Sequence, residues 1–178
     1  MTKPVVPEIP ATDAEWLKRP GLSAALIAIA LIELLWALAD LPNLFGGVSN
    51  LFGDVPRSAL AVPITTARLV CHPLLAIAAL VLAATGRLRH AIVALGGIVI
   101  MTWLNHLPWL GRLNLEETRD LQWAVKQIVA FPLMTVVAVL LAARDTRLGL
   151  AIALVSIPTV NNLLGLASYV VGIVINGP

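Results

Sequence analysis

The chain has 178 residues, of which 59% are hydrophobic and only 12% are charged, and its mean hydropathy is +0.91. A soluble domain averages about 45–50% apolar and 25% charged residues, so this composition excludes a water-soluble globule and favours lipid as the solvent. The net charge of +2 comes without the basic, aromatic-interleaved patch that binds nucleic acid, and the single cysteine, Cys71, excludes an internal disulfide and any CxxC motif.

The first twenty residues, MTKPVVPEIPATDAEWLKRP, contain four prolines and charges of both signs. A secretory signal would begin with a basic stretch and pass quickly into a short apolar core, which this segment does not do. We therefore expect residues 1–20 to form a polar cytoplasmic tail and residues 21–178 to form a single five-helix transmembrane domain.

Five apolar runs follow, each long enough to cross a hydrocarbon layer of roughly 30 Å as a helix. The predicted spans are Gly21–Leu41, Ala59–Ala84, Ala91–Trp109, Leu121–Ala142 and Leu148–Ile175. The last is long enough to tilt or to be broken at Pro158. The expected fold class is therefore all-α, a polytopic integral membrane helix bundle.

The connections between the spans differ in charge. The second and fourth, TGRLRH and ARDTR, are short and basic, whereas the first and third are longer and acidic on balance. By the positive-inside rule, this pattern predicts a multi-pass protein of the plasma (inner) membrane with its N-terminus in the cytoplasm and its C-terminus outside. The first connection also contains a short duplication, NLFGGVS followed by NLFGDVP, which is either an interfacial turn or a lid.

Every predicted span carries polar or ionisable side chains. At about 1.5 Å of rise per residue, most of them fall between ~16 and ~27 Å from the cytoplasmic end of their helix, in the outer half of the bilayer. Ionisable groups in spans almost always face the bundle interior or a cavity, which makes these residues a candidate binding site. The candidates are Glu33, Asp40, Arg68, His72, His106, Lys126, Asn161 and Asn162.

Helical spacing places several of these residues on shared faces. Glu33 and Asp40 are seven apart on the first span, and Arg68 and His72 are four apart on the second. Gln122 and Lys126 share a face of the fourth span, which we also expect to point inward. Matching depths pairs Asp40 with Arg68 or Lys126, and Glu33 with His72.

Three functions are compatible with this layer. The first is a pocket for a small polar or anionic ligand, protons or a lipid headgroup, in a protein that transports, senses or serves as a subunit of a membrane complex. The second is a redox subunit that binds a quinone or haem b, with His72 and His106 as axial ligands on different helices. The third is a small membrane enzyme acting on a lipid or isoprenoid, although no catalytic motif is present. Buried ion pairs that only hold the helices together are the structural alternative.

Overall fold

The computed structural model describes residues 20–45 and 60–176, and within these ranges the chain consists of helices joined by short turns, with no strand. Five helices are long and apolar enough to cross a membrane. They are α2 (Pro20–Phe45), α3 (Ala61–Ala84), α4 (Leu88–His106), a composite helix over Thr118–Ala143, and α7 (Leu148–Asn176). The all-helical class and the five candidate spans are confirmed, while most of the expected tail and of the duplicated loop lies outside the described residues.

Two spans differ from their predicted form because of proline. α4 ends at His106 and passes into a 3₁₀ turn η2 (Leu107–Arg112), because Pro108 has no N–H for the Leu104 carbonyl four residues earlier, and this carbonyl accepts the Leu107 N–H instead. The composite helix runs through α5 (Thr118–Ala124), a π-helical turn η3 (Val125–Ala130) and α6 (Phe131–Ala143). Pro132 has no N–H for the Ile128 carbonyl four residues earlier, and this carbonyl accepts the Trp103 indole N–H at 3.1 Å instead.

Of the two alternatives for the last span, a tilt or a break at Pro158, the break is not found. Pro158 lies inside α7, which is continuous from Leu148 to Asn176. Interior prolines are tolerated in membrane helices where neighbouring helices satisfy the freed backbone groups, and Pro158 is itself buried between them.

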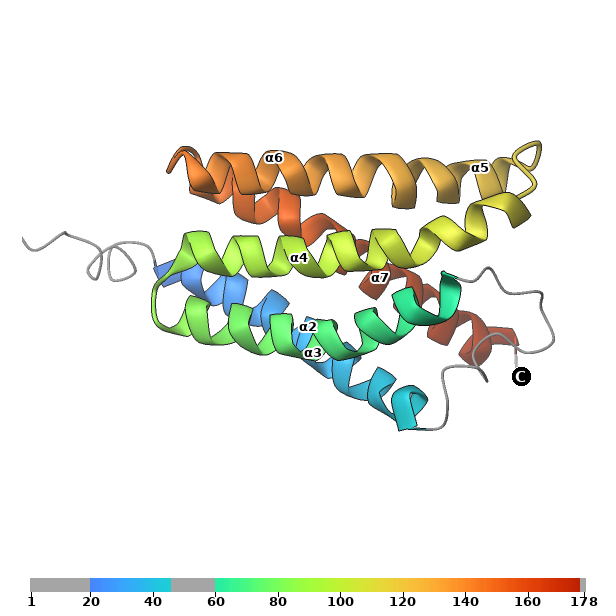
Figure 1. The fold of residues 1–178 in the computed structure, drawn as a ribbon, viewed down its shortest axis with the longest axis horizontal. Helices are drawn as coiled ribbons and strands as arrows, with labels where there is room; N and C mark the ends of the chain where they lie inside the picture. The colour runs from blue at the N-terminus through green and yellow to red at the C-terminus, as the bar shows by residue number, and fades with distance from the viewer. Residues whose placement is uncertain (1–19, 46–59, 177–178) are drawn as a thin grey trace, which may run out of the picture.

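The helices form a closed ring of neighbours (Figure 1). α2 packs on α3, α3 on α4, α4 on α6 and α6 on α7, and α7 returns to contact α2 and α4. Residues from all five helices therefore reach the centre of the bundle.

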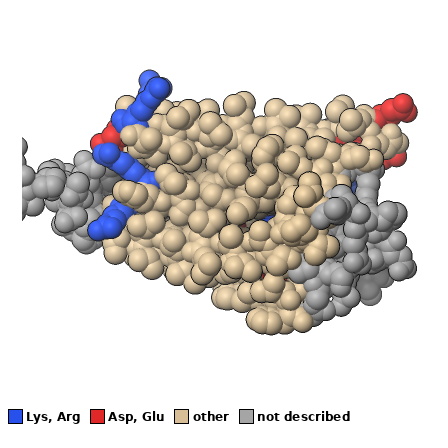
Figure 2. Space-filling view, in the orientation of Figure 1, with Lys and Arg blue, Asp and Glu red and all other residues tan. Residues whose placement is uncertain are grey.

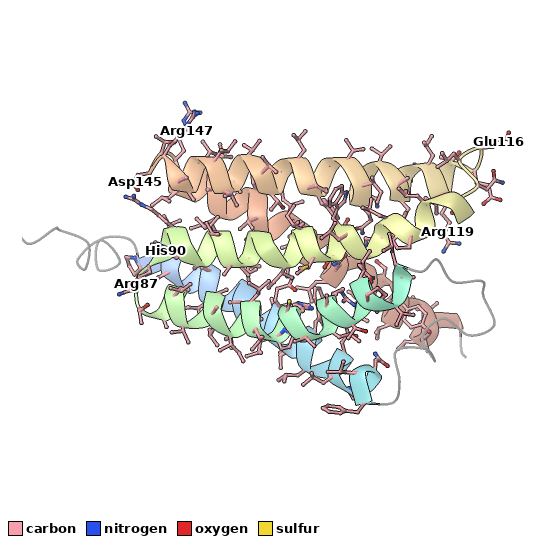
Figure 3. The ribbon with its side chains drawn as sticks, viewed as in Figure 1. Arg87, His90, Glu116, Arg119, Asp145 and Arg147 are labelled. Atoms are coloured by element: carbon pink, nitrogen blue, oxygen red, sulfur yellow. The ribbon has the colours of Figure 1, made fainter. Side chains whose placement is uncertain are left out.

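The two ends of the bundle differ in charge. One end, called the basic end below, carries the turns between α3 and α4 and between α6 and α7. Arginines gather there, as Figure 2 shows, and Figure 3 labels Arg87 and Arg147 at this end. An ion pair between Arg89 and Asp145 joins the two turns. The opposite end, called the far end, carries the segment between η2 and α5, where Glu116 is exposed (Figure 3).

The apolar core fills the half of the bundle next to the basic end. It is built from small and branched side chains of all five long helices, among them Leu26, Ala79, Ile92, Ala138 and Val155. Toward the far end, the last buried residues are Val99 in α4, Phe131 in α6 and Thr159 in α7. Only the α2–α3 pair stays closely packed beyond that level, with Ala37, Thr65 and Leu69 buried.

One polar group inside this core has no partner. Thr135 is 1% exposed and its hydroxyl makes no hydrogen bond within the described residues. A buried polar group without a partner is destabilising. We expect Thr135→Val, which keeps the shape and removes the hydroxyl, to raise the free energy of unfolding by about 1 kcal/mol. Thermal unfolding in detergent checks this, and an unchanged or lower midpoint would contradict it.

Candidate functional site

A buried polar cluster joins three helices at the boundary of the core. Glu33 of α2 is 7% exposed and His72 of α3 is 5% exposed, and His72 Nε2 lies 2.9 Å from Glu33 Oε2. The Thr159 hydroxyl of α7 donates to Glu33 Oε1 at 2.6 Å. Both carboxylate oxygens of Glu33 are thus engaged, each by a different helix.

The three side chains meet because they lie at one level. Counted from the basic end at about 1.5 Å per residue, Glu33 lies ~20 Å along α2, His72 ~18 Å along α3 and Thr159 ~17 Å along α7. The sequence-based pairing of Glu33 with His72 is therefore confirmed. Pro73 and Pro158 adjoin two of these residues.

The second expected pair is also present. Arg68 Nη2 donates to Asp40 Oδ2 at 2.9 Å, and the two side chains are 22% and 37% exposed. Asp40 lies seven residues (~10.5 Å) beyond Glu33 along α2, and Arg68 lies four residues (~6 Å) beyond His72 in the same direction, because α3 runs antiparallel to α2. The long arginine side chain spans the difference. Asp40 therefore pairs with Arg68 and not with Lys126. This pair lies on the far-end side of Glu33 and His72, in contact with solvent-accessible space.

A small cavity adjoins the buried cluster. Its volume is about 70 Å³, enough for a few water molecules at roughly 30 Å³ each. It is lined by Glu33, Arg68, His72, Ile98, Val99, Thr102, Trp103, Gln127, Phe131, Pro158 and Asn162. Since Glu33, His72 and Arg68 all line the cavity, it connects the buried pair to the Arg68 side chain.

The other candidate residues are dispersed around this cluster. His106 is half-buried and packs edge-on against Trp123, with ring centroids 5.0 Å apart. Asn161 is half-buried, and the exposed Asn162 reaches the cavity. Neither asparagine side chain hydrogen-bonds to another residue within the described ranges.

The expectation that Lys126 faces the bundle interior is wrong. Lys126 and Gln122 are both exposed, and Lys126 forms no ion pair with any described residue. Spacing shows that two residues share a helix face but not which way that face points. Gln127 lines the cavity instead, at the π-helical turn that precedes Pro132.

Sequence reasoning missed two neutral members of the site, Thr159 and Trp103. Both residue types are common in membrane helices and carry no charge, so nothing in their type marked them. The available signal for Thr159 was depth, because it lies at the level of Glu33 and beside Pro158. Helical spacing does place Thr65 on the face of His72, but the bond from the Thr65 hydroxyl to Asn105 Oδ1, at 2.7 Å, was not predicted.

No group of three or more His, Cys, Asp or Glu side chains that could hold a metal ion is found within residues 20–45 and 60–176. The haem interpretation stays a prediction. His72 would have to give up the hydrogen bond between its Nε2 and Glu33 to bind iron through that atom.

The cluster brings two ionisable side chains together. A carboxylate and an imidazole 2.9 Å apart share one hydrogen bond, and both side chains are buried. Adding or removing a proton here changes the charge of a buried site, which alters both its hydrogen bonds and its hydration.

Comparison of the chain with models of known protein families, with curated proteins and with solved structures found no match.

Proposed function

We propose that this chain is a multi-pass membrane protein whose Glu33–His72 pair binds protons and couples their uptake to the packing of α2, α3 and α7, in transport or sensing. The observation that carries the proposal is a buried carboxylate–imidazole pair next to a cavity of water size. Ionisable residues inside membrane helices are rare and mark proton relays and ion pathways.

The size of the cavity favours protons over larger ligands. About 70 Å³ accommodates a few waters, whereas a haem, a quinone ring or a lipid headgroup would require the helices to move apart. Water in the cavity would give the pair a hydrogen-bonded route toward Arg68 and Asp40. A small anion at the Arg68 guanidinium would meet the neighbouring Glu33 and Asp40 carboxylates, which repel it.

The membrane orientation is part of the proposal. The arginines of the basic end are expected to lie on the cytoplasmic side of the plasma membrane, by the positive-inside rule. The N-terminus of α2 lies at that end and the C-terminus of α7 at the other (Figure 1). The proton site then lies between the bilayer midplane and the outer surface.

The proposal predicts a proton-binding step that involves both partners. In the purified wild-type chain, the infrared carboxyl signal and the thermal midpoint should both change with pH. Glu33→Gln should abolish the infrared change, because it removes the carboxyl group, and His72→Gln should alter the pH at which the change occurs, because it removes the imidazole that shares a hydrogen bond with Glu33.

A matched control is Asn105→Leu, which removes the interhelical bond from Thr65 but no titrating group. It should lower stability equally at all pH values and leave the titration intact. If Glu33→Gln and His72→Gln behave like Asn105→Leu, shifting stability without changing the titration, the pair only holds the helices together and the proposal is wrong.

A further inference from the structure

We infer that the Glu33–His72 pair is accessible from the far end of the bundle only, so that this conformation takes up protons from one side of the membrane and is closed to the other. This inference rests on the proposed function, and it concerns which aqueous phase supplies the proton.

The closed side is the half of the bundle between the pair and the basic end. Along α7, Val155 lies one turn toward the basic end from Thr159 and is 1% exposed. Behind it, Ile152, Ala151 and Leu148 are all at most 5% exposed. Over ~17–20 Å of helix, this half offers a proton no continuous chain of polar groups.

Only two polar side chains are buried in that half within the described residues. The Ser23 hydroxyl is bonded to the Ala83 carbonyl at 3.2 Å, and the Thr135 hydroxyl has no partner. Neither belongs to a chain of hydrogen bonds that leads to Glu33. A groove of about 500 Å³ indents the outside of this half between α3, α4 and α6, but its lining is apolar apart from Thr135 and it reaches neither Glu33 nor His72. Close apolar packing between the groove and the pair excludes water, so the closed half blocks proton exchange.

The open side begins at the pair itself. The cavity leads from Glu33 and His72 to Arg68, whose ion pair with Asp40 is partly exposed. Beyond Val99, Phe131 and Thr159, no described residue of α4, α5, η3 or α7 is buried. Figure 1 shows the helices diverging toward this end. Arg68 and Asp40 therefore stand between the buried pair and the far-end aqueous phase.

Prolines mark the boundary between the two halves. Pro73 follows His72, Pro132 follows Phe131 and Pro158 precedes Thr159. Each lies inside a membrane-length helix, where an interior proline allows a bend, and Pro132 and Pro158 lie where the close packing of their own helices stops. Opening of the closed half would use these positions.

Thiol labelling in vesicles of known orientation tests the access route. In a Cys71→Ser background, Asn162→Cys probes the cavity and Val155→Cys probes the closed half. Thr146→Cys marks the basic end and Leu115→Cys marks the far end, since both residues are exposed. The reagent is a membrane-impermeant, cationic methanethiosulfonate, added to one side at a time.

We expect Asn162→Cys to be labelled from the side that labels Leu115→Cys and not from the side that labels Thr146→Cys. Val155→Cys should stay unlabelled from both sides until the protein is unfolded. Labelling of Asn162→Cys from the Thr146 side, or of Val155→Cys in the folded protein, would overturn the inference.

A pH step on one side of the same vesicles separates this inference from the proposed function. The infrared carboxyl signal of the cysteine-free chain should respond to a step on the Leu115 side and not on the Thr146 side. A response to both sides overturns one-sided access. No response to either side overturns proton binding itself, whereas the labelling result still decides the access route.

Discussion

Glu33→Leu is expected to lower the free energy of unfolding by about 3 kcal/mol, the usual size of the loss when one partner of a buried pair is removed. The substitution leaves the His72 ring, which is 5% exposed, without the side-chain partner that it has among the described residues. The Thr159 hydroxyl can turn to the carbonyl four residues earlier in α7. Most of the loss therefore comes from the unpaired imidazole.

The double substitution Glu33→Leu with His72→Leu should recover most of that loss. Replacing a buried pair by apolar side chains of similar volume is often neutral or stabilising, and both positions adjoin the apolar core. We expect the double variant to unfold within about 1 kcal/mol of the wild type. Unfolding by SDS in mixed micelles measures all four corners of this cycle.

The outcome separates stability from function. If the double variant is as stable as the wild type but has no titration step, the pair is kept for proton binding and not for packing. If the double variant instead loses the sum of the unfolding free energies lost by Glu33→Leu and His72→Leu, the two side chains are not energetically coupled. The hydrogen bond between them would then contribute nothing measurable to stability.

The partly exposed pair Arg68–Asp40 was less predictable from the sequence than the buried one. Charges in an apolar run are conspicuous, and antiparallel helices of known direction fix which charges share a level, but Arg68 and Lys126 both matched the depth of Asp40. Five spans, their approximate bounds and the Glu33–His72 pairing follow from hydropathy, charge and rise per residue alone.

Other features were beyond sequence reasoning for physical reasons. Which way Lys126 points depends on the π-helical turn at Val125–Ala130. Pro132 leaves the Ile128 carbonyl of that turn without its helical donor, and the Trp103 indole of another helix donates to it instead. The role of Thr159 depends on which helix packs opposite Glu33, a tertiary fact. The continuity of α7 through Pro158 likewise depends on its neighbours and not on propensity.

The closeness of α4 and α6 is a further tertiary fact, and it depends on Gly96. A Cβ atom at this position would lie 3.0 Å from Val139 Cγ2 and 3.1 Å from Thr135 Cγ2. Both contacts are methyl groups of β-branched side chains, which have few alternative rotamers in a helix. Small residues of this kind let membrane helices approach closely.

We therefore expect Gly96→Val to lower the free energy of unfolding by roughly 3 kcal/mol, at the upper end of what overpacking usually costs. The helices must separate to admit the new side chain, because Thr135 and Val139 cannot turn away from it. Gly165→Val in α7 is the matched control, since nothing lies within 4 Å of a Cβ there, and its effect should stay within about 0.5 kcal/mol. SDS unfolding of both variants checks the prediction. Equal effects at the two positions would mean that valine acts through backbone propensity alone, and that α4 and α6 are not in close contact at Gly96.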